Sequence, residues 1–509
     1  MTSLFPGYDT HIEVTQENID TYYQKLNKFT HQFKDFILTF CTDLYAYSHY
    51  NKYPEEIKQD IETIFSQQDL YDNFMSNKIQ EKDIKSSILK DFLFQSFGLI
   101  IPRKDIPEAE ITFKSLQHEI SADKAQQTHL FFQYVKSETQ SLNPDNTTFL
   151  DLGAGKGYLS AYVAFDMKRK IISVEASEKH GISLARRVCG LTSKFYNDIY
   201  QQIQGKLQSA DQDYDNLRIA ITMIDTAVDG TQVLNASQSL SWFYQNFKNK
   251  SMTEARIPLN SLNNNIQGVV AKSIQSASSI KTKDITYVPL GLHACGDLSV
   301  IALKMLLHSD VSYAFTVPCC YIHLSDNGFP LHKATIQPLE NLYDEFYPVT
   351  RKISNHKISE HVLRFAGTGF DEKFEDLNLI IQQFFDRAVL DKCRIVKGLN
   401  TKTVAIKRTG TFTEWVQQQL IKENALMNEE EINKIYNQCE EHKWAMKAHL
   451  IFRKIAGQVL ESMILVDRYM WLRNNNFQGK IDWCMGGYSG RGFVLWGKKI
   501  TDQQQKQDQ

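Results

Sequence analysis

The segment from Asp151 to Ser160, DLGAGKGYLS, restricts the possible folds more than any other part of the chain. It follows a short run of strand-forming residues, Thr148 to Leu152, and leads into a helical pattern. Its alternate glycines allow a sharp turn and let a ligand approach the main chain closely. A second expected strand, Lys170 to Glu175, ends on a carboxylate. This order of strand, turn, helix and strand predicts a parallel sheet with helices on its faces.

The same alternation continues along the chain. We expect three more strands in this region, at Leu217 to Ile224, Thr286 to Leu292 and Val311 to Val317. Two short strands around Ile481 and Val494 flank a glycine-rich loop, which favours an antiparallel hairpin near the end of the chain.

A chain of 509 residues exceeds what one hydrophobic core normally serves, so we expect several regions. These are a helical N-terminal region (1–105), an α/β domain (106–370) with a low-complexity insertion (231–279), a helical insertion (371–470), a strand hairpin that completes the sheet (471–500) and a disordered tail (501–509).

Composition excludes several classes of protein. Lys and Arg number 57 and Asp and Glu 59, so no strong positive field marks a nucleic-acid-binding protein, although local basic patches remain open. The eight cysteines are too sparse for a disulfide scaffold and include no CxxC pair. The N-terminus lacks a signal-peptide pattern, and the apolar stretch from Phe92 to Ile101 is too short to cross a bilayer. We therefore expect an intracellular protein, cytoplasmic or nuclear, with no membrane contact.

The residues around the glycine turn indicate which cofactor the chain binds. Glu175 can accept hydrogen bonds from both hydroxyls of a ribose. The spacing is GxGxG instead of the GxGxxG of dinucleotide sites, and Asp151 would repel a pyrophosphate but attract the ammonium group of an amino acid. This pattern favours S-adenosylmethionine over NAD. A phosphate-binding P-loop is excluded because Gly157, not Ser or Thr, follows Lys156.

Two further loops carry titratable groups. The first, Gly291 to Ser299, contains His293 and Asp297, and the second, Val317 to His323, contains Cys319 and Tyr321. If their strands are neighbours in a parallel sheet, both loops open at the edge where the cofactor is expected. Asp297 can orient or deprotonate an accepting group with help from His293, and Tyr321 can stack on a base. Asp297 can equally cap the helix that begins near Leu298.

The same loops contain residue types that bind metals. They are His293, Cys295, Cys319, Cys320 and His323. Adjacent cysteines are poor joint ligands, and neither CxxC nor HxxxH spacing occurs. We therefore expect no metal, and interpret the cysteines as small packing residues at strand ends.

At four segments the sequence resembles the methyltransferase-like protein 25 family: Asp151 to Ser160, Gly291 to Leu298, Cys319 to Tyr321 and Leu460 to Arg468. A related pattern, a His-Leu-Cys-Gly loop followed by Cys-Cys-His-His, occurs in the tRNA acceptor-stem 2′-O-methyltransferases, with Tyr321 here replacing the first of those histidines. The resemblance implies a class I, Rossmann-like α/β methyltransferase fold that uses S-adenosylmethionine. It implies a seven-stranded sheet with an antiparallel last strand, next to the helical regions.

We accordingly expect an S-adenosylmethionine-dependent methyltransferase whose macromolecular substrate is RNA, either tRNA or rRNA. The alternatives are a protein methyltransferase and a cofactor-binding fold retained as a non-catalytic interaction module. The expected cofactor-binding residues are Asp151, Gly153, Gly155, Gly157, Glu175 and Asp225, and the expected catalytic residues are His293, Asp297, Cys319 and Tyr321. We expect Glu461, Asp467 and Arg468 to form surface ion pairs and to take no part in catalysis.

Overall fold

The structure is a computed structural model. It describes residues 17–33, 43–75, 81–103, 106, 111, 120–175, 180, 217–221, 285–325, 327–331, 363, 366–367, 374–401, 408 and 410–500. Asp225, the expected insertion at 231–279 and the expected tail at 501–509 lie outside these residues.

The chain divides into two compact units. One contains residues 1–103 and 333–466, and the other contains residues 104–332 and 467–509. The N-terminal helices and most of the later helical segment, which we expected to form two regions, therefore fold as one unit.

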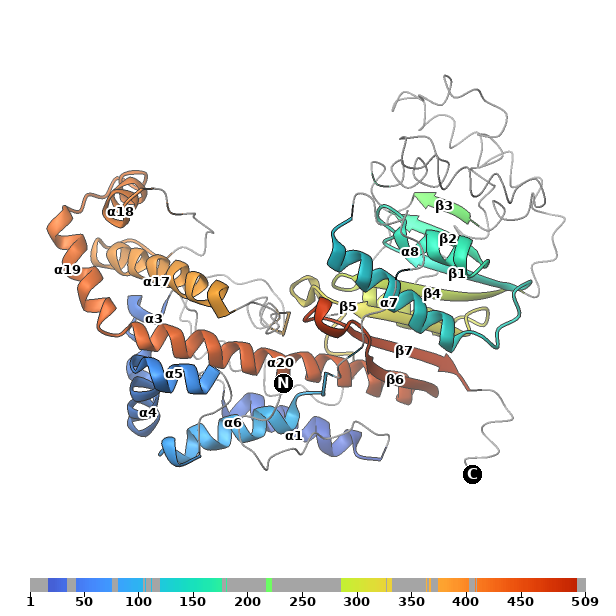
Figure 1. The fold of residues 1–509 in the computed structure, drawn as a ribbon, viewed down its shortest axis with the longest axis horizontal. Coiled ribbons are helices and arrows are strands. Elements are labelled where there is room, and N and C mark those ends of the chain that lie inside the picture. Colours follow the sequence, from blue (N-terminus) through green and yellow to red (C-terminus); the bar gives the residue numbers. More distant parts are fainter. Residues whose placement is uncertain are drawn as a thin grey trace, which may run out of the picture. The chain divides into compact units, whose positions relative to one another are not determined.

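The first unit is helical (Figure 1). Its helices are α1 (Ile19–Gln32), α3 (Asp43–Ala46), α4 (Glu55–Ser66), α5 (Gln68–Met75), α6 (Ser87–Leu99), α17 (Phe374–Val396), α18 (Phe412–Ile421), α19 (Glu429–Glu440) and the part of α20 (Lys443–Asn474) before Asp467, with the 3₁₀ turns η1 (His49–Lys52) and η2 (Glu81–Asp83). Capping boxes that start at Thr411 and Asn428 begin α18 and α19.

The aromatic side chains of the N-terminal helices form the core of this unit. The Phe92 ring lies 5.7 Å from Phe29 and 5.1 Å from Phe33, between ring centroids. Phe452 of α20 packs against Phe92 at 5.4 Å and against Phe65 at 5.7 Å. All five rings are buried, so they form part of the hydrophobic core of this unit.

The second unit contains a mixed sheet with the strand order β3-β2-β1-β4-β5-β7-β6 (Figure 1). The strands are β1 (Thr147–Leu152), β2 (Lys170–Glu175), β3 (Leu217–Ile221), β4 (Thr286–Ala294), β5 (Tyr313–Pro318), β6 (Phe477–Trp483) and β7 (Phe493–Lys499). The first five strands pair in parallel, and β7 pairs antiparallel with both β5 and β6. The predicted α/β architecture and the C-terminal hairpin are confirmed.

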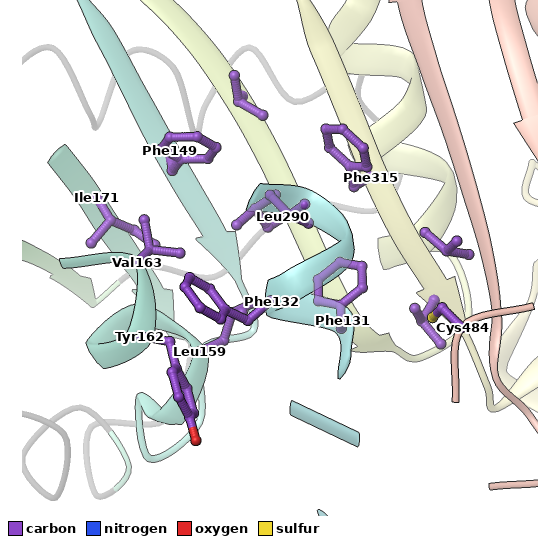
Figure 2. Close-up of a cluster of buried hydrophobic side chains, with 14 of the residues drawn as sticks. Phe131, Phe132, Phe149, Leu159, Tyr162, Val163, Ile171, Leu290, Phe315 and Cys484 are labelled. Carbon is purple, nitrogen blue, oxygen red and sulfur yellow. The ribbon is translucent and has the colours of Figure 1, made fainter. Parts of the chain in front are cut away.

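One face of this sheet is covered by α7 (Ala122–Glu138), α8 (Tyr158–Ala161) and the π-helical turn η4 (Tyr162–Asp166). Figure 2 shows Phe131 and Phe132 of α7 against strand residues that include Leu290 and Phe315. The opposite face is covered by α14 (Leu298–Lys304), the 3₁₀ turn η7 (Met305–Leu307) and the last residues of α20, including Leu472. Because both faces are buried, β1 reads as a continuous buried run with no polar alternation.

No helix within the described part of the chain is both long enough and apolar enough to cross a bilayer.

Candidate active site

Four loops that carry expected site residues begin where parallel strands end. Because β2, β1, β4 and β5 are consecutive neighbours in the sheet, these loops lie along a single edge. The glycine turn follows β1 and Glu175 ends β2. The His293–Asp297 segment begins in the last two residues of β4, and the Cys319–Tyr321 segment follows β5. This edge is the usual ligand site of open α/β sheets.

The glycine turn has the backbone conformation that the sequence predicts. Gly153, Gly155 and Gly157 all have positive φ, at 73°, 55° and 76°. The amides of Gly153 and Ala154 both donate to the carbonyl oxygen of Val174, at 2.9 and 3.0 Å, which ties the turn to the end of β2. A Cβ at Gly153 would lie 3.0 Å from Cδ2 of Leu298. The turn therefore packs directly against the loop that carries Asp297.

Glu175 joins the end of β2 to the glycine turn. Its Oε2 accepts a hydrogen bond from the Gly155 amide at 2.7 Å. Nδ1 of His180 lies 3.8 Å from its Oε1. The carboxylate is thus held beside the backbone segment that the sequence assigns to the cofactor.

The carboxylate of Asp151 does not lie open to a ligand. It is 3 % exposed and accepts a hydrogen bond from Oγ of Ser160 at 2.5 Å, and Ser160 in turn accepts one from Ser173 at 2.6 Å. Burial raises the pKa of Asp151 to about 6, against the lowering effect of the Ser160 hydrogen bond. The expected attraction of Asp151 for the ammonium group of a cofactor stays a prediction. In the structure its carboxylate ties β1 to α8 beneath the turn.

His293 lies at an irregularity in β4. The pairing with β5 shifts register between Leu292 and Ala294, and His293 at that point has a φ of 53°. Bulges of this type redirect a side chain and occur often beside active sites. Burial, reinforced by the positive charges of Lys124 and Arg491, lowers the pKa of His293 to about 4. The imidazole is consequently uncharged at neutral pH.

Asp297 anchors another loop and does not cap a helix with its side chain. It precedes α14, but its carboxylate makes no capping hydrogen bond. Oδ1 accepts from the Ser325 amide at 2.9 Å and Oδ2 accepts from the Ser325 hydroxyl at 2.5 Å. The side chain is 5 % exposed. The helix-cap alternative is thus wrong, and the buried carboxylate holds the segment that follows β5.

Tyr321 does not present a free ring to a nucleic-acid base. It is 1 % exposed, in the 3₁₀ turn η8 (Tyr321–His323), and the guanidinium of Arg468 lies over its ring, 5.9 Å from the centroid. Burial lowers the pKa of Arg468, and the charges of Asp467 and Asp297 act in the opposite direction. The stacking role expected for Tyr321 is contradicted by this burial.

The expected surface ion pairs in α20 are buried. In the helical unit, Glu461 forms an ion pair with Arg103 at 2.8 Å, and the side chain of Glu461 is buried. Asp467 and Arg468 are fully buried, and Asp467 accepts from the Leu331 amide at 2.8 Å. The prediction of structural roles holds for these contacts, whereas the prediction of a surface location is wrong.

Three thiols meet at the ends of β4 and β5. The sulfur of Cys295 lies 3.5 Å from that of Cys319, which lies 3.5 Å from that of Cys320. Hydrogen bonding by Cys319, helped by Cys320 and by the charges of His323 and Arg491, lowers the pKa of Cys295 to about 6. The pKa of Cys319 and that of Cys320 are raised. Of the three thiols, Cys295 therefore loses its proton most readily.

Lys124, Ser325 and Arg491 belong to this edge but were missed from the sequence. Arg491 donates from Nη1 to the Cys319 carbonyl at 3.2 Å. The sequence signal that could have identified Arg491 as a site residue is its position in a glycine-rich hairpin loop. No local pattern marks Lys124 at the start of α7 or Ser325 after β5. Asp225, the remaining expected cofactor residue, lies outside the described residues.

Comparison with known protein families supports the expectation of a methyltransferase. A family model described as a methyltransferase domain matches residues 123–327. Comparison with curated proteins and with solved structures finds no match. The matched span contains the glycine turn, Glu175 and the two loops at the ends of β4 and β5, so this part of the chain has a Rossmann-like fold and is similar to a methyltransferase domain.

Proposed function

We propose that this protein is an S-adenosylmethionine-dependent methyltransferase related to the methyltransferase-like protein 25 family, and that it acts on RNA. The observation that carries the cofactor assignment is the hydrogen bond from the Gly155 amide to Glu175, 2.7 Å long, at the ends of β1 and β2. It fixes a carboxylate beside a glycine turn at the ligand edge of the sheet.

The residues present fit such a cofactor. Among the described residues other than its chain neighbours, a Cβ built at Gly155 would meet only the carbonyl oxygen of Gly153 within 4 Å, at 3.9 Å, so the part of the chain that the structure describes leaves room for a ligand there. Glu175 would accept from the ribose hydroxyls, and the backbone of the turn would hold the amino-acid portion. Bound S-adenosylmethionine supplies a methyl group on a sulfonium. Asp151, buried under the turn, would keep the turn in place through Ser160.

The other side of the site favours an anionic substrate. The positive charges of Lys124 and Arg491 both lower the pKa of His293, so two cations act on the end of β4. Phosphate groups of RNA are a suitable partner for such a pair. His293, uncharged at neutral pH, can accept a hydrogen bond from an attacking hydroxyl or amino group without adding positive charge near a sulfonium. Much of the rate would then come from in-line positioning of that group.

The test is methylation of an extract from cells that lack this protein. Purified protein and S-adenosylmethionine with a radioactive methyl group are added, and the labelled material is treated with RNase or with protease. We expect label that RNase removes and that does not form with Glu175→Ala. Label that only protease removes would show that the substrate is a protein and not RNA. Absence of label above the Glu175→Ala background would contradict a catalytic function.

A further inference from the structure

The three cysteines at the ends of β4 and β5 form a cluster that the fold assembles from two loops. Cys295 is exposed, Cys320 is half-buried and Cys319 is buried. Their sulfur atoms all lie within 4.8 Å of one another. The sulfur of Cys319 lies 3.5 Å from each of the others, and none of the three cysteines forms a disulfide.

Contacts outside the cluster hold these loops in place. Ala294 and Pro318, which immediately precede Cys295 and Cys319, are paired in the sheet. The Gly296 amide donates to the Cys320 carbonyl at 3.2 Å. A Cβ at Gly296 would lie 2.3 Å from the carbonyl oxygen of His323, so the two loops approach as closely as glycine permits. The guanidinium of Arg491 donates to the Cys319 carbonyl at 3.2 Å.

This geometry matches a soft metal ion. Tetrahedral zinc with Zn–S bonds of about 2.3 Å places its sulfur ligands roughly 3.8 Å apart, within a few tenths of an ångström of the separations found here. Thiolates select zinc over magnesium or calcium, which prefer oxygen ligands. We infer that Cys295, Cys319 and Cys320 bind one Zn²⁺ ion, with the fourth coordination position left to water or to a donor atom of a substrate.

A site with three protein ligands differs in role from a structural zinc site. Structural sites fill all four positions with protein ligands, whereas reactive sites keep one open. The open position fits a cluster that reaches the surface at Cys295. Binding requires deprotonated cysteines, so the ion displaces the remaining thiol protons into solvent and no oxidation or reduction takes place.

The first experiment measures zinc in the full-length protein, purified under reducing conditions without a chelator. We expect close to one zinc per chain by mass spectrometry of the metal content, and retention of that zinc against a weak chelating dye. Replacement by Co²⁺ should give the sulfur-to-cobalt charge-transfer absorption of thiolate ligands. A metal-free protein that neither takes up Zn²⁺ from solution nor gives the cobalt absorption would overturn the inference.

The second experiment compares variants. Cys295→Ser and the double variant Cys319→Ser with Cys320→Ser should bind zinc at least about 100-fold more weakly, since even loss of groups that support a ligand costs 10- to 100-fold. Cys439→Ser, at a buried cysteine in the helical unit, is the matched control and should bind zinc like the wild type. Equal affinity in all variants would contradict the site, as would a cluster that forms a disulfide between Cys295 and Cys319 but takes up no metal after reduction. These readouts do not depend on methyl transfer.

Discussion

His293 combines a left-handed backbone conformation with a lowered pKa. Its φ of 53° is uncommon for a residue other than glycine, although histidine tolerates it better than most. The neighbouring charges of Lys124 and Arg491, together with burial, keep the imidazole neutral. Conformations of this kind persist where the surrounding structure enforces them, and they cluster at functional sites.

The His293 pKa makes stability depend on pH in a defined direction. The folded pKa is about 4 and the ordinary value is 6.5, so between these values the unfolded chain binds a proton that the folded chain does not. Acidification through this range therefore destabilises the folded state. His293→Asn removes the titration and tolerates positive φ. Thermal melting at pH 6.5 and pH 4 should show a smaller loss of Tm for the variant than for the wild type. Equal losses would show that His293 is not the group responsible.

Glu175 should contribute most of the specific recognition of the proposed cofactor. Glu175→Ala removes a charged acceptor and should weaken binding of S-adenosylhomocysteine by about 1.5–3 kcal/mol, or roughly 10- to 150-fold in Kd. Glu175→Gln is the matched control, because its carbonyl oxygen can still accept from the Gly155 amide, and it should lose less. Calorimetry gives both values. An unchanged Kd in Glu175→Ala would show that Glu175 does not bind the ribose.

At the scale of elements, the loop after β5 depends on a single residue of the loop after β4. Asp297 accepts two hydrogen bonds from Ser325, which lies 28 residues later in the chain. Sequence rules for helix caps consider only residues near a helix end. They therefore identified Asp297 as a hydrogen-bond acceptor but assigned it to the amides of α14, whereas its partner is Ser325. The sequence analysis considers Cys295, Cys319 and Cys320 as metal ligands but expects no metal, because spacing rules for metal ligands do not include a sulfur from an adjacent strand.

Replacement of Asp297 should therefore cost stability. Asp297→Ala leaves the partly buried Ser325 amide without its acceptor, at a cost of about 1–3 kcal/mol in the free energy of unfolding, whereas Ser325→Ala removes one hydroxyl hydrogen bond and should cost about 1 kcal/mol. Urea denaturation of both single variants and the double variant gives the coupling energy. Additive effects would show that the two residues do not act together.

Asp297→Asn addresses the predicted catalytic role of the same residue. The amide oxygen can still accept from Ser325, but the side chain cannot take a proton. Methyl transfer at the wild-type rate by a stable Asp297→Asn variant would limit Asp297 to holding the loop. Loss of transfer with unchanged cofactor affinity and stability would support a role in the reaction.

At the scale of the whole molecule, alternation of strands and helices was enough to predict the α/β domain and its C-terminal hairpin. Which helices belong to the helical unit could not be predicted in the same way. Its core joins aromatic residues of the first hundred positions to Phe452, and its boundary falls inside one continuous helix, between Val466 and Asp467. Helical periodicity identifies buried faces but does not say which distant helix covers them.

Phe452 provides a test of this division. Its ring contacts Phe65, Phe74 and Phe92, so Phe452→Ala should lower the free energy of unfolding by about 3–5 kcal/mol. The proposed cofactor site lies in the other unit, and binding of S-adenosylhomocysteine at a temperature where the variant is folded should be unchanged. A loss of affinity comparable to that of Glu175→Ala would contradict the assignment of Phe452 to the helical unit alone.

The most direct test of the proposed function is calorimetric titration of the purified protein with S-adenosylmethionine, S-adenosylhomocysteine and NAD. The glycine turn, the Gly155–Glu175 hydrogen bond and the matched methyltransferase domain lead us to expect saturable binding of both S-adenosyl compounds at one site per chain. NAD should give no heat of binding. Binding of NAD without either S-adenosyl compound, or binding of none of the three, would contradict the account.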